Sequence, residues 1–278
     1  MIFGSHVSIR NGYFSAAQYA ASIEARAFQF FPKNPRSLTI KPFNQEDAER
    51  CKTYCQQRQL VSIAHTPYPT SLTPHEDKKQ LTIDSLVNDL EIAEACGAAG
   101  VVVHFGTRII NNAPLSSYRL MIAMLNKVLQ HWDGKCKILL ENNAGKAGSL
   151  GVTMEELVQV RNLTDFPEHI GFCLDTCHAF ASGLWNGDNW QEIVENGEKL
   201  GYFEHLKAIH LNNSKYPSGQ GKDRHANLFH NGKIHKDQLL GLINSPVLSG
   251  LPFVLETPSE EGITHAEEIQ QLHKECGK

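Results

Sequence analysis

Short apolar runs rich in β-branched and aromatic residues alternate along the chain with longer amphipathic stretches. Eight of these runs have the length of a β-strand, and we predict strands over residues 2–8, 27–31, 60–66, 100–106, 137–142, 170–176, 207–212 and 253–257. Runs that are apolar throughout, rather than at alternate positions, are typical of parallel strands covered on both faces. The pattern therefore predicts a parallel sheet buried beneath helices.

The stretches between the runs have the length and periodicity of helices. We predict helices over residues 45–59, 78–96, 116–130, 154–161, 190–200, 236–243 and 265–275. Eight strands separated by helices in fewer than 300 residues favour an α/β fold of the (β/α)8 or TIM barrel type over a doubly wound sheet, which usually has fewer strands. The GxGxxG turn of a dinucleotide-binding sheet is also missing from the sequence. No linker or low-complexity segment breaks the alternation, so we expect one TIM-barrel domain over residues 1–278.

Composition and charge exclude several classes of protein. Hydrophobic residues make up 41% and charged residues 20% of the 278, as in an ordinary globular protein, and no apolar run reaches the roughly 18 residues that a membrane span needs. The first residues do not resemble a secretory signal, so a cytoplasmic location is expected. Seven cysteines without a CxxC pair predict reduced thiols. With a net charge of −4, DNA binding requires a local basic patch or bound cations.

Candidate chemistry is concentrated where the predicted strands end. In a TIM barrel the catalytic groups lie at the carboxyl ends of the strands and in the loops that follow. Six successive strands end in a side chain that can bind a metal, in the order His65, His104, Glu141, Asp175, His210 and Glu256. His178 follows three residues after Asp175, and the long helix-poor segment 212–233 contains Asp223 and His225, whose spacing lets an extended chain point both side chains the same way.

So many imidazoles and carboxylates at one barrel mouth predict a metal centre with more than one ion. Without cations these groups would repel one another or leave buried polar atoms unpaired. Their number exceeds the three or four protein ligands of a single catalytic zinc, and the mixed nitrogen and oxygen set suits zinc, manganese or iron better than magnesium or calcium. The 14 histidines, about 5% of the chain, point the same way.

With these residues in place, the sequence resembles the endonuclease IV family of apurinic/apyrimidinic endonucleases. The resemblance covers essentially the whole chain through GSHVS, FPKNPR, HTPY, VVHFG, LENNAG, LDTCHAF, IHLNNSK, DRHAN and LETP. It implies a TIM barrel with three zinc ions, with manganese or iron as alternatives at some sites. It also implies hydrolysis of the phosphodiester 5′ to abasic sites in double-stranded DNA and removal of blocked 3′ ends. A closed barrel needs no partner strand, so a monomer is expected.

The resemblance assigns nine metal ligands in three sets. These are His65, His104 and Glu141 for one zinc; Glu141, Asp175, His210 and Glu256 for the second; and His178, Asp223 and His225 for the third. Glu141 bridges two ions in this scheme and helps to orient the attacking nucleophile, which makes it the expected catalytic residue.

The residues that the resemblance assigns to DNA depart more from the family. Arg36 matches an arginine that the family inserts into the base stack, and Tyr68 matches an aromatic residue that enters the DNA at the lesion. Pro69 stands where the family usually has leucine, and residues 228–235 replace a glycine-rich family segment. We expect Arg36, Tyr68 and Pro69 to contact DNA, within a basic rim formed by Lys33, Arg36, Lys215, Lys222, Arg224 and Lys233.

Two alternative functions share this pattern. A sugar isomerase or epimerase of the xylose isomerase-like barrel type needs only one or two ions, which Glu141, Asp175, His210 and Glu256 could hold alone. The five additional candidate ligands favour the trinuclear nuclease. A metal-stabilised DNA-binding protein without turnover is the other alternative, supported by Pro69 and the altered segment 228–235.

Overall fold

A computed structural model describes residues 1–109, 113–145, 149–259 and 262–277. Eight parallel strands close into a barrel in the order β1-β10-β7-β6-β5-β4-β3-β2. Their bounds are β1 Ile2–His6, β2 Ala27–Phe30, β3 Val61–His65, β4 Gly100–His104, β5 Lys137–Glu141, β6 Ile170–Asp175, β7 Leu206–His210 and β10 Pro252–Leu255. Two short strands, β8 (Asn213–Ser214) and β9 (His225–Ala226), pair antiparallel outside the barrel. The predicted TIM barrel is confirmed.

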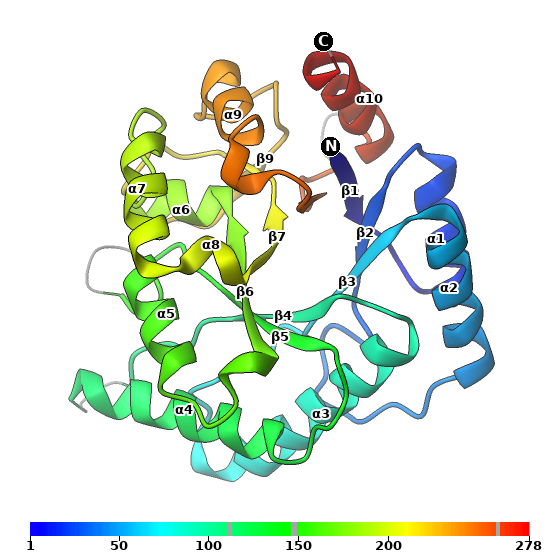
Figure 1. Cartoon of the computed structure of the whole chain (residues 1–278), viewed down its shortest axis with the longest axis vertical. Helices are drawn as coiled ribbons and strands as arrows, with labels where there is room; N and C mark the ends of the chain where they lie inside the picture. Colours follow the sequence, from blue (N-terminus) through cyan, green and yellow to red (C-terminus); the bar gives the residue numbers. More distant parts are fainter. Residues whose placement is uncertain (110–112, 146–148, 260–261, 278) are drawn as a thin grey trace.

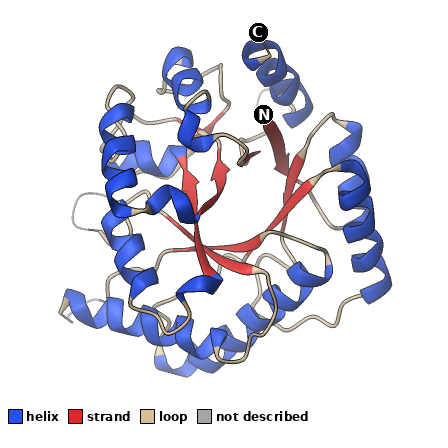
Figure 2. Ribbon diagram, in the orientation of Figure 1, coloured by secondary structure: helices blue, strands red, loops and turns tan. Residues whose placement is uncertain are grey.

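Helices surround the strands on the outside, as Figure 1 shows by label and Figure 2 by colour. Their bounds are α1 Tyr13–Ser22, α2 Gln45–Arg58, α3 Lys79–Ala95, α4 Pro114–Leu129, α5 Met154–Asn162, α6 Thr176–Ser182, α7 Trp190–Leu200, α8 Tyr202–His205, α9 Lys236–Ile243 and α10 His265–Cys276. All seven predicted helices are present, with ends that differ by at most two residues. The sequence pattern missed α1, α6 and α8, of which α6 and α8, with 7 and 4 residues, contain too few turns for a periodic signal.

Two apolar layers hold the barrel together. The larger lies between the strands and the helices, and a smaller layer fills the barrel interior with Ala27, Ile63, Val102, Leu139, Cys173, Ala208 and Val254. Side chains alternate between the two faces of a strand, so the residue two positions after an interior one also points into the barrel. His65 follows Ile63 in this way, and His104 follows Val102. The interior layer therefore forms an apolar floor beneath the polar residues at the strand ends.

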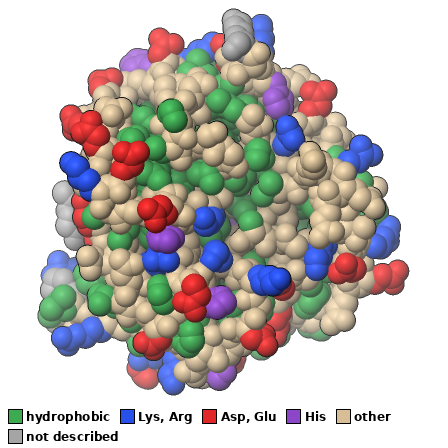
Figure 3. All heavy atoms as spheres, viewed as in Figure 1, with side chains coloured by type: hydrophobic (Ala, Val, Ile, Leu, Met, Phe, Trp, Pro, Cys, Tyr) green, Lys and Arg blue, Asp and Glu red, His purple; other side chains and the backbone are tan. Residues whose placement is uncertain are grey.

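Charges of both signs are mixed on the surface. On the face that Figure 3 shows, acidic and basic side chains lie interspersed instead of gathering by sign. None of the described helices combines the length and the apolar composition needed to cross a membrane.

Candidate metal centre

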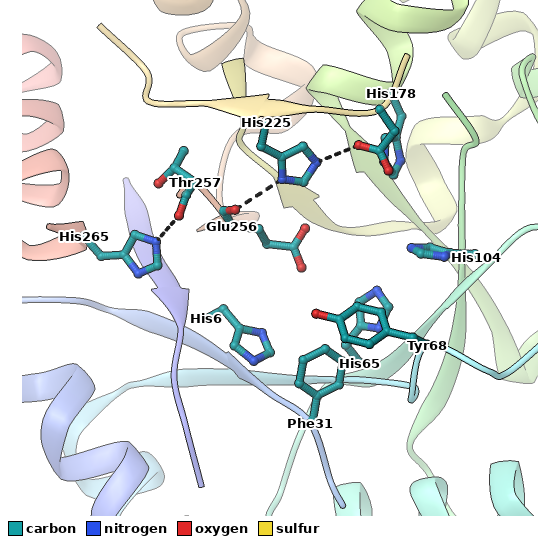
Figure 4. Close-up of a pocket in the computed structure, with 11 residues that line it drawn as sticks. His6, Phe31, His65, Tyr68, His104, His178, His225, Glu256, Thr257 and His265 are labelled. Atoms are coloured by element: carbon teal, nitrogen blue, oxygen red, sulfur yellow. Dashed lines mark hydrogen bonds and ion pairs between the residues drawn. The ribbon is translucent and has the colours of Figure 1, made fainter. Parts of the chain in front are cut away.

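The barrel brings the predicted ligands to one mouth. His65, His104, Glu141, Asp175 and His210 are the last residues of their strands, and Glu256 directly follows β10. Strand pairing sets neighbouring ligands at one level, since His104 pairs with Glu141 and Asp175 with His210. In Figure 4 the imidazoles of His65, His104, His178 and His225 face a common cavity beside the Glu256 carboxylate.

The remaining ligands come from local structure after β6 and β7. The Asp175 side chain accepts a 2.7 Å hydrogen bond from the backbone N–H of His178 and so caps the short helix α6, which fixes where His178 emerges. Strand β9 begins at His225 and pairs with β8, which holds the long loop back over the barrel mouth. Asp223 and His225 point the same way, because the Asp223 carboxylate lies 3.3 Å from His178 Nε2 and 3.4 Å from His225 Nε2.

Candidate ligand atoms converge in three groups, within each of which they lie no more than 4.8 Å apart. The groups are His65, His104 and Glu141; Glu141, Asp175, His210 and Glu256; and His178, Asp223 and His225. These are the sets that the resemblance assigns. Asp175, Cys177 and His225 form a fourth such group. Burial raises the pKa of the Cys177 thiol, which keeps it protonated and makes it the weaker candidate.

Glu141 lies at the junction of two groups. Its Oε2 atom is 3.5 Å from His65 Nε2 and 3.2 Å from His104 Nε2, whereas its Oε1 atom is 2.8 Å from His210 Nδ1. Burial by itself raises the pKa of Glu141, but the positive charges of His210 and His104 outweigh this effect and hold the pKa well below its usual range. A buried carboxylate with each oxygen facing a different imidazole set can bridge two cations.

The charges of the centre are balanced by protons when no cation is bound. Burial opposes the charge on His178, yet Asp175 and Asp223 raise its pKa well above the usual value. His210 is also buried, and Cys173, Glu256 and Glu141 raise its pKa in the same way. The carboxylates therefore require positive charge at the positions that the imidazole nitrogens approach.

Four of the five candidate histidine ligands have one ring nitrogen held by a hydrogen-bond acceptor. The acceptor is a backbone carbonyl in three of them and the Gln29 side chain in the fourth. Carbonyl oxygens only accept hydrogen bonds, so the facing nitrogen carries a hydrogen and the other nitrogen is the one that could bind a cation. The donor and acceptor pairs are His65 Nδ1 with Thr66 O at 2.8 Å, His178 Nδ1 with Asn142 O at 2.9 Å, His225 Nδ1 with Glu256 O at 3.2 Å and His210 Nε2 with Gln29 Oε1 at 2.7 Å.

These residues fit metal ions. Around a tetrahedral zinc, ligand atoms lie about 3.3 Å from one another, and Glu141 Oε2 is 3.2 and 3.5 Å from two imidazole nitrogens. Two buried atoms of the centre, Glu141 Oε2 and His225 Nε2, have no hydrogen-bond partner among the described residues. Polar atoms left in this state are costly unless a ligand satisfies them.

Sequence reasoning missed three buried amides that hold the candidate ligands. Gln29 contacts His210, and Asn142 accepts from the Asp175 backbone N–H at 2.8 Å. Asn212 donates to Asp175 Oδ2 at 2.7 Å and accepts from the Glu256 backbone N–H at 2.9 Å. A signal was available, because Gln29 interrupts the apolar run 27–31, and the two asparagines stand one and two residues after candidate ligands.

Of the residues predicted to contact DNA, Tyr68 borders the same cavity. The cavity has a volume of about 330 Å³, and His6, Phe31, Tyr68 and His265 line it together with the candidate ligands. Tyr68 and Pro69 are the central residues of a turn closed by a 2.9 Å hydrogen bond from Thr70 N–H to Pro67 O. Both are exposed, and so is Arg36. All three predicted contacts thus lie on the surface, and Tyr68 is the one that lines the cavity.

The prediction that Lys33 belongs to the basic rim was wrong. Lys33 is buried, donates to Ser85 O at 2.6 Å and pairs with Asp89 Oδ1 at 2.9 Å. Its charge is neutralised beneath α3, so it cannot attract DNA. Arg36, Lys215, Lys222, Arg224 and Lys233 are exposed, as the prediction requires.

The altered segment 228–235 is firmly attached to the barrel. The Asn213 amide donates to Leu228 O at 2.7 Å and to Ile234 O at 2.9 Å. A Cβ atom at Gly232 would lie only 2.0 Å from the Asn213 side chain, so this close approach requires glycine. Phe229 packs against the core, with Lys236 Nζ 5.5 Å from its ring centre.

Comparisons with known proteins agree with this geometry. Residues 17–276 match the family described as xylose isomerase-like TIM barrel. The chain is 41% identical to a probable endonuclease 4 of Symbiobacterium thermophilum over 97% of both chains. The crystal structure of endonuclease IV from Thermus thermophilus covers 100% of this chain, with 98% of its own length, at a TM-score of 0.86 and 27% identity.

A structure of a D-tagatose 3-epimerase-like protein also aligns, over 99% of this chain and 98% of its own, with a TM-score of 0.69. At 19% identity this likeness shows the shared barrel fold alone. The match to the probable endonuclease 4 extends over nearly the full length at higher identity. The chain therefore belongs to the endonuclease IV family of xylose isomerase-like TIM barrels.

Proposed function

We propose that this protein is a metal-dependent endonuclease that hydrolyses the phosphodiester 5′ to abasic sites in double-stranded DNA and also trims blocked 3′ ends. The observation that carries the proposal is the convergence of nine candidate ligands in three groups, two of which share Glu141. We propose three zinc ions as the cofactor, with manganese or iron as alternatives at some sites. We further propose that the protein acts as a cytoplasmic monomer built from one domain.

The candidate ligands have defined tasks in this reaction. Metal ions, when bound, neutralise the phosphate and lower the pKa of a water molecule towards neutrality. His65 and His104 would hold one ion, His178, Asp223 and His225 another, and Asp175, His210 and Glu256 the third. Glu141 would join the first and last of these sets and orient the nucleophile. The apolar layer around Val102 and Leu139 keeps bulk water away from the floor of the centre.

The surface around the cavity would recognise the lesion. Bending DNA and turning out a nucleotide costs a few kcal/mol of stacking, which side chains inserted into the gap must offset. Arg36 supplies a cation, and the Tyr68 ring, 65% exposed, supplies a flat apolar surface. Pro69 adds a rigid apolar contact beside it. The exposed cations of the remaining rim would hold the phosphates of a duplex despite the net charge of −4.

The alternative sugar isomerase would use fewer of these residues. Its ligands would be Glu141, Asp175, His210 and Glu256, and it would give no task to His65, His104, His178, Asp223 and His225. Those five side chains lie within ligand distance of one another or of Glu141. We therefore favour the nuclease.

Metal content measured together with cleavage of an abasic-site duplex tests the proposal. We expect close to three transition-metal ions per chain and incision 5′ to the abasic site. His104→Ala should lose metal and activity together while the barrel stays folded, and replacement of the exposed His131, in the turn after α4, provides a matched control. A metal-loaded protein that leaves abasic DNA intact but interconverts sugars would establish the alternative.

A further inference from the structure

Gln29 is a buried amide in the middle of an apolar strand. It belongs to β2, is 0% exposed and lies two residues after Ala27, a member of the interior layer. Its side chain therefore points into the barrel, directly beneath the candidate metal centre. Its hydrogen-bond partners come from three other parts of the barrel, namely β1, β7 and the segment after β10.

The amide oxygen of Gln29 determines which nitrogen His210 presents to the centre. Gln29 Oε1 lies 2.7 Å from His210 Nε2 and can only accept, so Nε2 carries the hydrogen. The opposite nitrogen, Nδ1, then faces Glu141 Oε1 at 2.8 Å and Glu256 Oε2 at 3.3 Å. This is the position from which an imidazole lone pair would reach an ion between those carboxylates.

The amide nitrogen of Gln29 holds Glu256. Gln29 Nε2 donates to Glu256 Oε1 at 2.5 Å and directs its second hydrogen to His6 Nδ1 at 3.2 Å. Glu256 follows the end of β10, and its side chain is 20% exposed, so the strand ladder does not fix its rotamer. With Oε1 held by Gln29, the other oxygen remains directed towards His210.

We propose that Gln29 is a positioning residue for the group formed by Glu141, Asp175, His210 and Glu256. It holds two of the four candidate ligands, His210 and Glu256, which stand at the ends of the neighbouring strands β7 and β10. The imidazoles of His65, His178 and His225 are oriented by backbone carbonyls, which a substitution cannot remove. His210 is oriented by a side chain, so this contact can be deleted selectively. The inference rests on the proposed metal centre.

Replacement of Gln29 by methionine tests the inference, since methionine has a similar length and no amide. Zinc stoichiometry and affinity are measured by competition with a chelator, and the absorption spectrum of the cobalt(II)-loaded protein reports the ligand geometry. We expect the wild type to hold three ions and Gln29→Met to hold two with unchanged affinity. Affinity for the third ion should fall about 10- to 100-fold, as for other residues that orient metal ligands.

Val102→Ala is the matched control, because Val102 lies in the same interior layer and forms no polar contact with the centre. It should lower the unfolding temperature and leave all three affinities unchanged. If Gln29→Met does not fold, Gln29→Asn provides the test, because it keeps a polar amide but withdraws it by one methylene, about 1.5 Å. It should lose affinity for the same ion.

A folded Gln29 variant that binds all three zinc ions with wild-type affinities would overturn the inference. So would an affinity loss of the same size in Val102→Ala, since it would reveal a general effect of the barrel interior. Failure of the proposed function would look different, because the wild type itself would then bind no transition metal or leave abasic DNA uncut.

Discussion

The backbone N–H of Tyr68 donates a 2.8 Å hydrogen bond to the carbonyl oxygen of Pro35. This bond joins the turn after β3 to the loop after β2, which carries Arg36. The Tyr68 ring also packs edge-on against Phe31, with 5.2 Å between ring centres, and Phe31 packs in the same manner against His65. The surface proposed to enter DNA is thus one connected unit that leads to a candidate metal ligand.

Substitution of Pro69 by leucine should widen the margin by which the protein prefers abasic over intact duplex. Proline is shorter than leucine and has a fixed φ, so it fills less of the gap left by a missing base. Competition binding of the two duplexes at one fixed salt concentration measures the margin. Cleavage of a single-stranded-like site should stay unchanged. An unchanged or narrower margin would place the apolar contact elsewhere, and the packing of Phe229 against the core argues against that residue.

Glu141→Gln should reduce turnover far more than DNA affinity. The substitution keeps the side-chain volume but removes the charge and one oxygen of a carboxylate that faces two imidazole sets. We expect the single-turnover cleavage rate to fall about 100-fold or more, with the dissociation constant for DNA nearly unchanged. The exposed Glu168 offers a matched Glu→Gln control. Weaker binding with an unaltered cleavage rate would contradict the role assigned to Glu141.

Lys33→Met should destabilise the protein by about 3–5 kcal/mol, because it leaves the buried Asp89 carboxylate without its partner. The double replacement Lys33→Met with Asp89→Leu should lower the free energy of unfolding by less than Lys33→Met alone. Urea unfolding of the wild type and the variants measures these differences. Burial raises the pKa of Asp89 to about 7 even though Lys33 lowers it. Removal of Lys33 raises this pKa further, so the loss of stability of Lys33→Met relative to wild type should increase as the pH rises above about 7, and a loss that does not vary with pH would contradict this account.

His6 should make the protein less stable in mild acid. Burial lowers its pKa to about 4, although Glu256 opposes the shift, whereas the unfolded chain takes up this proton near pH 6.5. Below pH 6.5 the unfolded state therefore binds a proton that the folded state does not. The free energy of unfolding should fall by up to roughly 3 kcal/mol by pH 4. His6→Asn should unfold with a shallower dependence on pH over this range, at equal metal loading. Equal slopes for wild type and variant would show that His6 is not the group responsible.

The sequence by itself determined the barrel and the positions of its candidate ligands. Apolar runs of strand length, separated by helices, specify a parallel sheet covered on both faces, and the carboxyl ends of parallel strands meet at one mouth when the sheet closes. His65, His104 and Glu141 could therefore be assigned to a common surface before any distance was known. The ends of the strands were less predictable, because an apolar run such as 2–8 continues past the last paired residue, His6.

Only the tertiary structure decided which polar atoms meet within that mouth. Gln29 and His210 are far apart in sequence and touch because barrel closure brings β2 and β7 to the same interior level, which no periodicity records. Lys33 has the composition of a surface cation but is buried, because Asp89 on α3 supplies the opposite charge that stabilises it there. Periodicity fixes the face on which a side chain lies, whereas its partners depend on strand order, register and helix docking, which are properties of the whole fold.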